Sequence, residues 1–288
     1  MSNLNKVLVA VGILLSWSGC KEIGPEITLR GNGKAISDTS YIESPIATPE
    51  LKNVVIEEFT GVRCPNCPQG HQIIKSIKQA NPNRIVVVSL HPINSLGAPY
   101  SFSVQDFRTQ QAQSLFDYFG QIGLQPAASI DRVKFSGENA VLLDKNKWIG
   151  YVNQQLTVAT PININVEAIY DSVTRELTAV VELHYTQSIT EENRLTVAIT
   201  ESEIVTAQLD GSVIDTFYTH KDIMRTFLTA LQGDQITATT VAGRVVRKVY
   251  KVTLDTLWKP ENMKLAAYVH QFSNVKNVYQ GKEVEILP

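Results

Sequence analysis

Residues 53–67 read NVVIEEFTGVRCPNC, and this stretch decides the fold of the first half of the chain. Asn53–Thr60 is rich in β-branched and apolar residues, which is typical of a buried strand. Residues 61–63 predict a turn, and the Cys-x-x-Cys motif of Cys64 and Cys67 stands where a helix should begin. Apolar residues at helical spacing then continue to about residue 80. We therefore expect a strand, a turn with two cysteines and a helix in direct succession.

Further elements follow this unit in a regular order. The sequence predicts a strand over Arg84–His91, a helix over about Val104–Phe119, a strand over Ala127–Asp131 and a last helix over about Ala140–Leu156. Strands that alternate with helices favour a mostly parallel or mixed sheet covered by helices. Residues 51–158 are thus expected to form an α/β domain.

The placement of the two cysteines has a chemical meaning. With Cys64 at the N-cap and Pro65 at the first helical position, the Cys64 sulfur lies at the positive end of the helix dipole. This environment, together with the Arg63 charge, is expected to lower the thiol pKa below its usual value of roughly 8.5. Cys67 lies one turn further on and can resolve a mixed disulfide by attack on Cys64. Pro68 would then remove an early helix bond and distort the first turn.

Two other interpretations of the cysteine pair stay open at this stage. The pair could form an inert structural disulfide. Closing a loop this small removes little entropy from the unfolded chain, however, and so adds little stability. Alternatively, Cys64, Cys67 and His71 share one helical face and could bind zinc or copper together with a fourth ligand such as His91. We predict a redox dithiol with His71 as a neighbour of the site, and no metal and no cofactor.

The strand and turn resemble the active-site segment of thioredoxins. In that family a buried carboxylate lies six residues before the nucleophilic Cys, and Glu58 stands at that offset; the alternative is a Glu that faces water. Thioredoxins also carry a cis-proline beside the dithiol, and Pro126 fits that slot, unless it is an ordinary trans proline. The resemblance implies that Gln125 presents its backbone to a substrate and that Arg63 is a further contact. The motif's Pro-Asn pair departs from the Gly-Pro pair of thioredoxins.

A wider pattern is similar to a second family. Residues 58–71 read EFTGVRCPNCPQGH, and Ile130-Asp131-Arg132 follows the proline. Both resemble the outer-membrane protein family of Bacteroidetes that is named for its mass of twenty-eight kilodaltons. Membership would imply an anchored lipoprotein with a thioredoxin-like domain followed by a β-rich domain. The resemblance implies location and fold more firmly than a reaction.

The N-terminus predicts export and lipid attachment. Residues 1–20 hold a polar start, a short apolar run and small residues before Cys20. The run is about half the roughly 20 residues that a spanning helix needs, which favours a cleaved signal. Cys20 resembles the acylated cysteine of the bacterial lipobox, although Trp17 departs from that pattern and an ordinary signal peptide is the alternative. Residues 21–50 carry Gly and Pro breaks and predict a flexible tether.

Residues 160–288 predict an all-β, immunoglobulin-like sandwich. Alternating runs separated by turn signals continue to the end of this segment. One helical insertion is expected over Asp222–Leu231. His220, Asp222 and Arg225 resemble a stretch of the same outer-membrane family, with a ligand or interface role as one interpretation and a satisfied loop as the other.

Composition narrows the function classes. The chain has 288 residues with 26 Lys+Arg against 28 Asp+Glu, a formal charge of −2 that argues against nucleic-acid binding. Two functions remain, both lipid-anchored in the bacterial cell envelope, with the outer membrane as the favoured location. One is a thiol–disulfide oxidoreductase for exported proteins, with Cys64, Cys67, Glu58 and Pro126 as its catalytic residues. The other is a non-catalytic binding or structural lipoprotein with envelope partner proteins.

Overall fold

The strand that precedes the cysteine motif forms as predicted. The structure is a computed structural model that describes residues 35–120 and 125–287. In it, β2 (Val54–Phe59) is buried along its whole length. The other elements of the first half are α1 (Cys67–Ala80), β3 (Ile85–Leu90), α2 (Gln110–Tyr118), β4 (Ala127–Ile130), β5 (Leu143–Asp144), the 3-10 helix η1 (Lys145–Lys147) and α3 (Trp148–Gln155).

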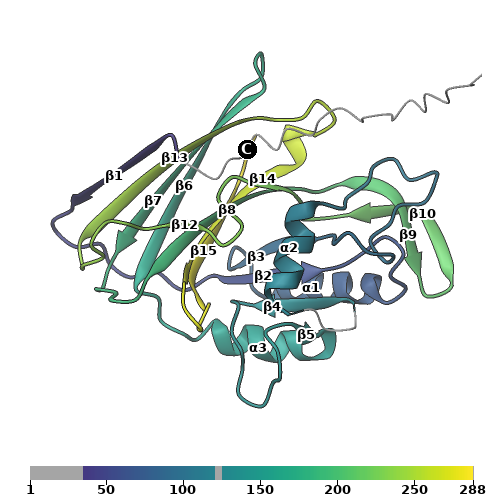
Figure 1. Cartoon of the computed structure of the whole chain (residues 1–288), viewed down its shortest axis with the longest axis horizontal. Helices are drawn as coiled ribbons and strands as arrows, with labels where there is room; N and C mark the ends of the chain where they lie inside the picture. Colours follow the sequence, from purple (N-terminus) through teal and green to yellow (C-terminus); the bar gives the residue numbers. More distant parts are fainter. Residues whose placement is uncertain (1–34, 121–124, 288) are drawn as a thin grey trace, which may run out of the picture. The chain divides into compact units, whose positions relative to one another are not determined.

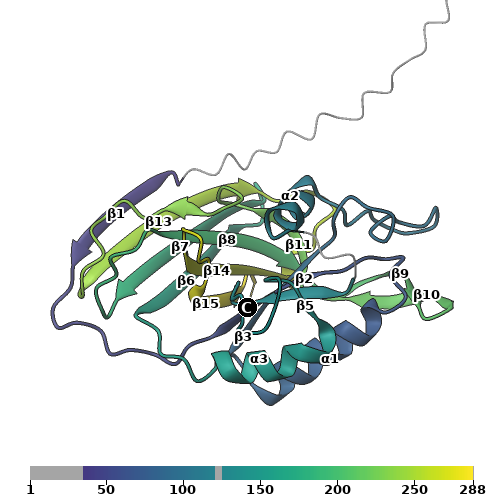
Figure 2. The ribbon, with the colours of Figure 1, turned by 60° about the horizontal axis from the view of Figure 1, so that its bottom comes forward.

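The strands of this half lie in the order β3-β2-β4-β5. β3 is parallel to β2, whereas β4 is antiparallel to β2 and β5 is antiparallel to β4. α1 and α3 lie on one face of these strands and α2 lies on the other (Figure 2). Apolar side chains of each helix pack against the strands. The prediction of a mostly parallel or mixed sheet covered by helices is therefore confirmed as a mixed sheet, with β5 as a short strand where the sequence predicts the start of the last helix.

The first helix begins later than predicted. α1 starts at Cys67, with Asn66 as its N-cap, so Cys64 is not at the N-cap and Pro65 is not helical. Pro68 explains the shift, because it lies in the first turn, where a missing N–H breaks no helix bond. The expected distortion at Pro68 is thus avoided by the position of the helix start.

The second half is built almost wholly from strands. Its elements are β6 (Ile162–Asp171), β7 (Glu176–Tyr185), β8 (Asn193–Glu201), β9 (Ile204–Asp210), β10 (Val213–His220), β11 (Ile223–Phe227), β12 (Asp234–Gln235), β13 (Arg244–Thr253), the 3-10 helix η2 (Pro260–Asn262), β14 (Met263–Gln271) and β15 (Val278–Glu285). A four-stranded sheet has the order β1-β13-β7-β6, and β9 and β10 form a separate hairpin (Figure 1). Apolar side chains of β6, β7 and β13 meet those of β8 and β14, which forms the core of the predicted sandwich.

One expectation for the secondary structure is wrong. The segment Asp222–Leu231 contains no helix; residues 223–227 form β11, which pairs with β3 and β8. Its apolar residues happen to have helical spacing, but a bulge between Met224 and Thr226 breaks the two-residue alternation of a strand. Within the expected tether, Ser37–Ile42 forms β1 and pairs with β13.

One long sheet joins the two halves of the sequence. Its order is β15-β14-β8-β11-β3-β2-β4-β5, with β12 paired to β8. β3 and β11 are neighbours in this sheet, although they come from either side of residue 159. The division into domains at 51–158 and 160–288 stays a prediction from sequence, and the sheet itself is continuous across it.

Candidate functional site

The two cysteines of the motif form a closed and buried disulfide. Cys64 and Cys67 are bonded, with 5.4 Å between their Cα atoms. Their exposed fractions are only 1% and 0%. The amide of Cys64 donates to the carbonyl of Gly61 at 3.1 Å, and the amide of Cys67 donates to the carbonyl of Cys64 at 3.2 Å. The turn is therefore held by its own backbone, with neither sulfur atom open to solvent.

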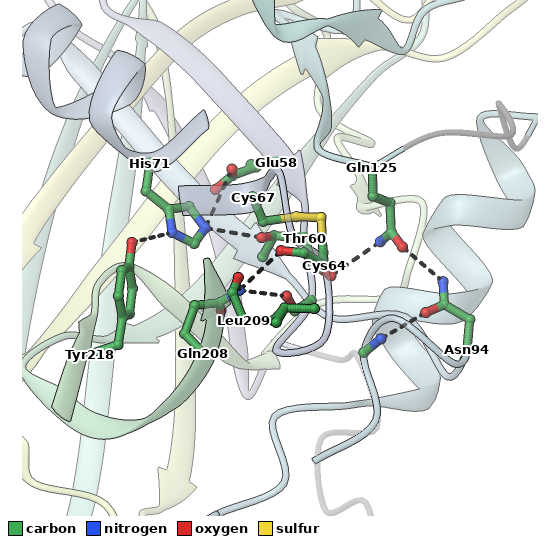
Figure 3. The surroundings of a disulfide bond; sticks show 12 residues. Glu58, Thr60, Cys64, Cys67, His71, Asn94, Gln125, Gln208, Leu209 and Tyr218 are labelled. Atoms are coloured by element: carbon green, nitrogen blue, oxygen red, sulfur yellow. Dashed lines mark hydrogen bonds and ion pairs between the residues drawn. A yellow bond between two sulfur atoms is a disulfide. The ribbon is translucent and has the colours of Figure 1, made fainter. Parts of the chain in front are cut away.

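The β9–β10 hairpin covers this turn. The amide of Leu209 donates to the carbonyl of Val62 at 2.8 Å, and the amide of Gly211 donates to that of Pro65 at 2.9 Å. The Gln208 side chain lies between them and donates through Nε2 to the carbonyls of Gly61 and Cys64 (Figure 3). These contacts hold the hairpin against the turn that carries the two cysteines.

Glu58 lies on β2, the strand that leads into the cysteine motif, and is fully buried (Figure 3). The alternative of a water-facing side chain is therefore wrong. Ser89 donates to Oε2 at 3.1 Å, but Oε1 has no hydrogen-bond partner among the described residues. Burial raises the pKa of the Glu58 carboxyl from 4.5 to about 8, so the group is mostly protonated at neutral pH.

His71 connects Glu58 to the hairpin. Its Nε2 lies 2.9 Å from the Thr60 hydroxyl and 3.6 Å from Glu58 Oε1, and its Nδ1 lies 2.6 Å from the Tyr218 hydroxyl. Burial lowers the pKa of His71 to about 3, so the ring is neutral. The contact with Glu58 is therefore a contact of two uncharged groups and not a salt bridge, despite its geometry.

Pro126 has the predicted cis bond, and the neighbouring Gln125 and the turn residue Arg63 are held by hydrogen bonds. The Gln125–Pro126 peptide bond is cis, as predicted. The Gln125 side chain donates to the carbonyl of Thr60 at 3.1 Å and accepts from Asn94 at 3.2 Å, which ties this segment to the turn. Arg63 is exposed and donates to the carbonyls of Ala98 and Pro99 at 3.0 and 2.6 Å. The roles of Gln125 and Arg63 toward a substrate stay predictions.

The Ile130-Asp131-Arg132 stretch forms a buried charge cluster. Arg132 contacts the Glu57 carboxylate through two nitrogens at 2.9 and 2.6 Å, and Tyr268 donates to the same carboxylate at 2.7 Å. Burial alone would raise the pKa of Glu57, but the Arg132 charge and these hydrogen bonds hold it below its ordinary value. Asp131 pairs with Lys52 at 2.9 Å. These residues join β2 and β4 to β14, which is a structural role.

The other stretch that resembles the outer-membrane family, residues 220–225, also has its polar side chains bonded within the protein. His220 is buried and contacts the carbonyl of Ala207 at 3.3 Å. Asp222 pairs with Lys78 at 3.0 Å, and Arg225 pairs with Glu201 at 2.7 Å. These three residues hold the ends of β10 and β11 against α1 and β8.

Other predictions about the site have different outcomes. Cys20, the predicted site of lipid attachment, lies outside the described residues. Within residues 35–120 and 125–287, no group of three or more His, Cys, Asp or Glu side chains could hold a metal ion. Sequence reasoning missed Gln208 and Tyr218, because each lies about 145 residues from its partner in the motif and has no local signal.

Comparisons with known proteins give a family and a fold. The family model for outer membrane protein Omp28 matches residues 112–285. The structure of HBP35 of Porphyromonas gingivalis has a TM-score of 0.67 and 18% identity, covering 83% of this chain and 77% of that chain. Protein AGR_C_4864 from Agrobacterium tumefaciens has a TM-score of 0.51 and 11% identity, covering 83% of this chain and 96% of that chain. At such identities these likenesses show the fold alone.

A third structure is less similar. A domain of the outer membrane lipoprotein Omp28 from Porphyromonas gingivalis has a TM-score of 0.32 and 17% identity, covering 45% of this chain and 90% of that chain. The search of curated proteins found no match. In the part of the chain that the structure describes, no helix has both the length and the apolar character to cross a membrane.

Proposed function

The chain belongs to the Omp28 family of outer-membrane proteins, and on this premise we propose that it is a non-catalytic binding lipoprotein. Because the family is one of the outer membrane, the protein is a component of the bacterial cell envelope. In the proposal, an acylated Cys20 attaches it to the membrane, and acyl chains hold it there without a spanning helix. The α/β unit and the β-sandwich then serve as a scaffold for a partner.

The observation that carries this proposal is the closure of the disulfide. A nucleophilic cysteine must reach the sulfur or disulfide of its substrate, and reactive cysteines are accordingly exposed in part. Here Cys64 and Cys67 have exposed fractions of 1% and 0%, and the β9–β10 hairpin is hydrogen-bonded across the turn. A disulfide in this setting is expected to act as a covalent clamp on the start of α1.

We propose in addition that the α/β unit is thioredoxin-like. The strand order β3-β2-β4-β5, with β3 parallel and β4 antiparallel to β2, supports this assignment. So do the Cys-x-x-Cys motif after β2 and the cis-proline before β4. A fold hosts many functions, so this assignment implies no exchange activity by itself.

Exposed apolar side chains on the β9–β10 hairpin and on the 92–109 loop, which are joined by a hydrogen bond from the amide of Val104 to the Thr206 hydroxyl at 2.9 Å, support a binding role. Val213 and Phe217 on the hairpin have exposed fractions of 66% and 82%, and Phe102 and Val104 on the 92–109 loop have fractions of 56% and 71%. Large exposed apolar side chains that gather on one part of a surface are typical of contacts with partners. An envelope protein is the proposed partner class.

The test measures thiol exchange directly. We expect the oxidised protein not to catalyse the reduction of insulin by dithiothreitol, and a Cys67→Ala variant to trap no mixed-disulfide partner in cells. Cys20→Ala should release the protein from the membrane fraction. Catalytic insulin reduction by the wild type, together with trapped partners that depend on Cys64, would overturn the non-catalytic proposal.

One observation favours a second candidate, thiol–disulfide exchange after the hairpin moves aside. Glu58 is buried on the strand that leads into the cysteine motif, and its pKa of about 8 suits transfer of a proton near neutral pH. In this candidate Cys64 is the nucleophile, Cys67 resolves the mixed disulfide, Glu58 carries the proton, and Pro126 with Gln125 contacts the substrate. Insulin reduction that appears only in a variant with a loosened hairpin would favour it.

A further inference from the structure

A cleft opens between α1 and the strand ends of the second half. Its volume is about 630 Å³, which lies within the range of roughly 300–1,000 Å³ that is usual for small-molecule sites. Its lining comes from α1, from Tyr218 and the residues after β10, and from η2 and the ends of β14 and β15, and we call the charged residues of this lining the rim. Glu58 and Ser89 lie at its base.

The base of this cleft holds a polar atom that needs a partner. Glu58 Oε1 is buried without a hydrogen bond from any described residue. A buried polar atom without a partner costs roughly 1–3 kcal/mol, and native structures retain few of them. Because Glu58 lines the cleft, a bound molecule can supply the missing hydrogen bond.

The groups at the base are uncharged but can both donate and accept. A protonated carboxyl has one O–H donor and an acceptor oxygen, and neutral imidazole and tyrosine hydroxyl groups have the same dual character. Burial keeps His71 neutral and raises the pKa of the Tyr218 hydroxyl. Both ring nitrogens of His71 are already bonded, to Thr60 and Tyr218. Alcohol hydroxyl groups have the same dual character, so they are the complementary partners for Glu58 and Tyr218.

The charges of the rim largely cancel. Three lysines are already paired with acids, at 3.0 Å for Lys78–Asp222, 2.6 Å for Lys221–Glu203 and 2.7 Å for Lys264–Glu283. Of the charged residues at the rim, Lys75 and Glu261 lack a partner among the described residues, and their charges are opposite. A ligand with a net charge would meet a like charge in these pairs as often as an opposite one.

From this arrangement we propose that the cleft binds an uncharged ligand with several hydroxyl groups, of the saccharide class, with one hydroxyl hydrogen-bonded to Glu58. The volume accommodates one or two sugar rings. Tyr218 adds an aromatic ring to the wall, which can pack against the apolar face of a sugar. The proposal deepens the binding function proposed above and rests on it.

The test is a titration of the full-length protein, without its signal sequence, with single sugars. Glucose, galactose, mannose, N-acetylglucosamine and lactose are each followed by ligand-observed NMR at about pH 6.5, where Glu58 is protonated. Lysine and inorganic phosphate serve as charged probes. We expect saturable binding of at least one sugar and none of either charged probe.

Variants connect the binding to the cleft. Glu58→Ala should lower the affinity for the bound sugar at least tenfold. Glu58→Gln should keep the affinity within about threefold of the wild type, because an amide also donates and accepts. Tyr218→Phe, which keeps the ring, gives a second variant if Glu58→Ala does not fold, and it should weaken binding severalfold. Lys147→Gln, at an exposed ion pair outside the cleft, should have no effect.

Three results would overturn the proposal. These are no binding of any of the sugars at about 50 mM, equal binding by the wild type and by the Glu58 and Tyr218 variants, and binding of only the charged probes. None of them bears on the closed disulfide, which the insulin assay tests separately. Failure of this inference is therefore distinguishable from failure of the proposed function.

Discussion

The closure of the disulfide by Gln208 leads to a quantitative prediction. Gln208 is fully buried, and its Nε2 donates at 3.1 and 3.2 Å to the carbonyls of Gly61 and Cys64 in the turn. Gln208→Ala removes both bonds and leaves two buried carbonyl groups with fewer donors. The change should favour an open hairpin, because fewer bonds then hold it: the two backbone bonds of Leu209 and Gly211 and the Tyr218–His71 bond remain.

The magnitude follows from these contacts. Two hydrogen bonds contribute a net free energy of about 1–3 kcal/mol. Part of this is offset, because Gln208 Oε1 is itself buried without a partner and the variant removes it. We therefore take about 1–2 kcal/mol for the opening of the hairpin. Since 1.4 kcal/mol is a factor of ten, the open population should rise roughly 5- to 30-fold.

The assay is the rate of disulfide reduction. Wild type and variant are incubated with dithiothreitol, and free thiols are labelled with a maleimide over time. If reduction occurs from the open hairpin and opening is fast, its rate follows the open population, so Gln208→Ala should be reduced roughly 5- to 30-fold faster. Gln110→Ala, an exposed glutamine on α2, is the matched control and should behave like the wild type.

Urea unfolding of the same proteins separates local from global effects. The reasoning is refuted if Gln208→Ala is reduced at the rate of the wild type. It is also refuted if reduction of the wild type is already as fast as that of an exposed disulfide, because the hairpin would then give no protection.

Three further predictions concern stability and can be measured by urea unfolding. Glu57→Ala leaves Arg132 buried without its carboxylate and should lower the free energy of unfolding by about 3–5 kcal/mol; a loss below 1 kcal/mol would contradict the buried pair. The pKa of the Glu58 carboxyl is about 8 in the folded protein and 4.5 in the unfolded chain. Its contribution to stability is therefore present below pH 4.5 and lost as the pH rises to 8. The wild type should lose on the order of 4 kcal/mol over this range relative to Glu58→Gln, and parallel pH profiles would exclude the shift. Gly61→Ala would bring a Cβ within 2.3 Å of a backbone oxygen and should destabilise by about 1–3 kcal/mol or more, whereas Gly150→Ala, with open space in α3, should stabilise by about 0.5–1 kcal/mol.

Local patterns predicted those elements whose neighbours are close in sequence. The β-branched run at residues 53–60 became β2, because a strand buried on both faces needs apolar residues throughout. The cis-proline at position 126 was also predicted, from the resemblance to thioredoxins and not from a local pattern alone. The helix expected over residues 222–231 failed, since pairing with β3 and β8 outweighed a helical spacing of three apolar residues.

The start of α1 shows that sequence spacing can misplace the end of a helix even within a short stretch. Sequence spacing favoured Cys64 at the N-cap, where the helix dipole would activate its thiol. The helix begins at Cys67 instead, because Pro68 lacks an N–H and is tolerated only in the first turn. The predicted activation of Cys64 therefore loses its structural basis, although the cysteine pair itself was correctly singled out.

The sequence by itself determined the strand–turn–helix unit, the Cys64 and Cys67 motif within it, the sandwich that follows and the family. Tertiary structure alone decided whether the pair is open or covered. The covering groups, Gln208 and Tyr218, reach the motif from 144 and 147 residues away and are placed by the sheet that joins the two halves. Burial depends on such long-range contacts, and no local pattern of residues encodes them.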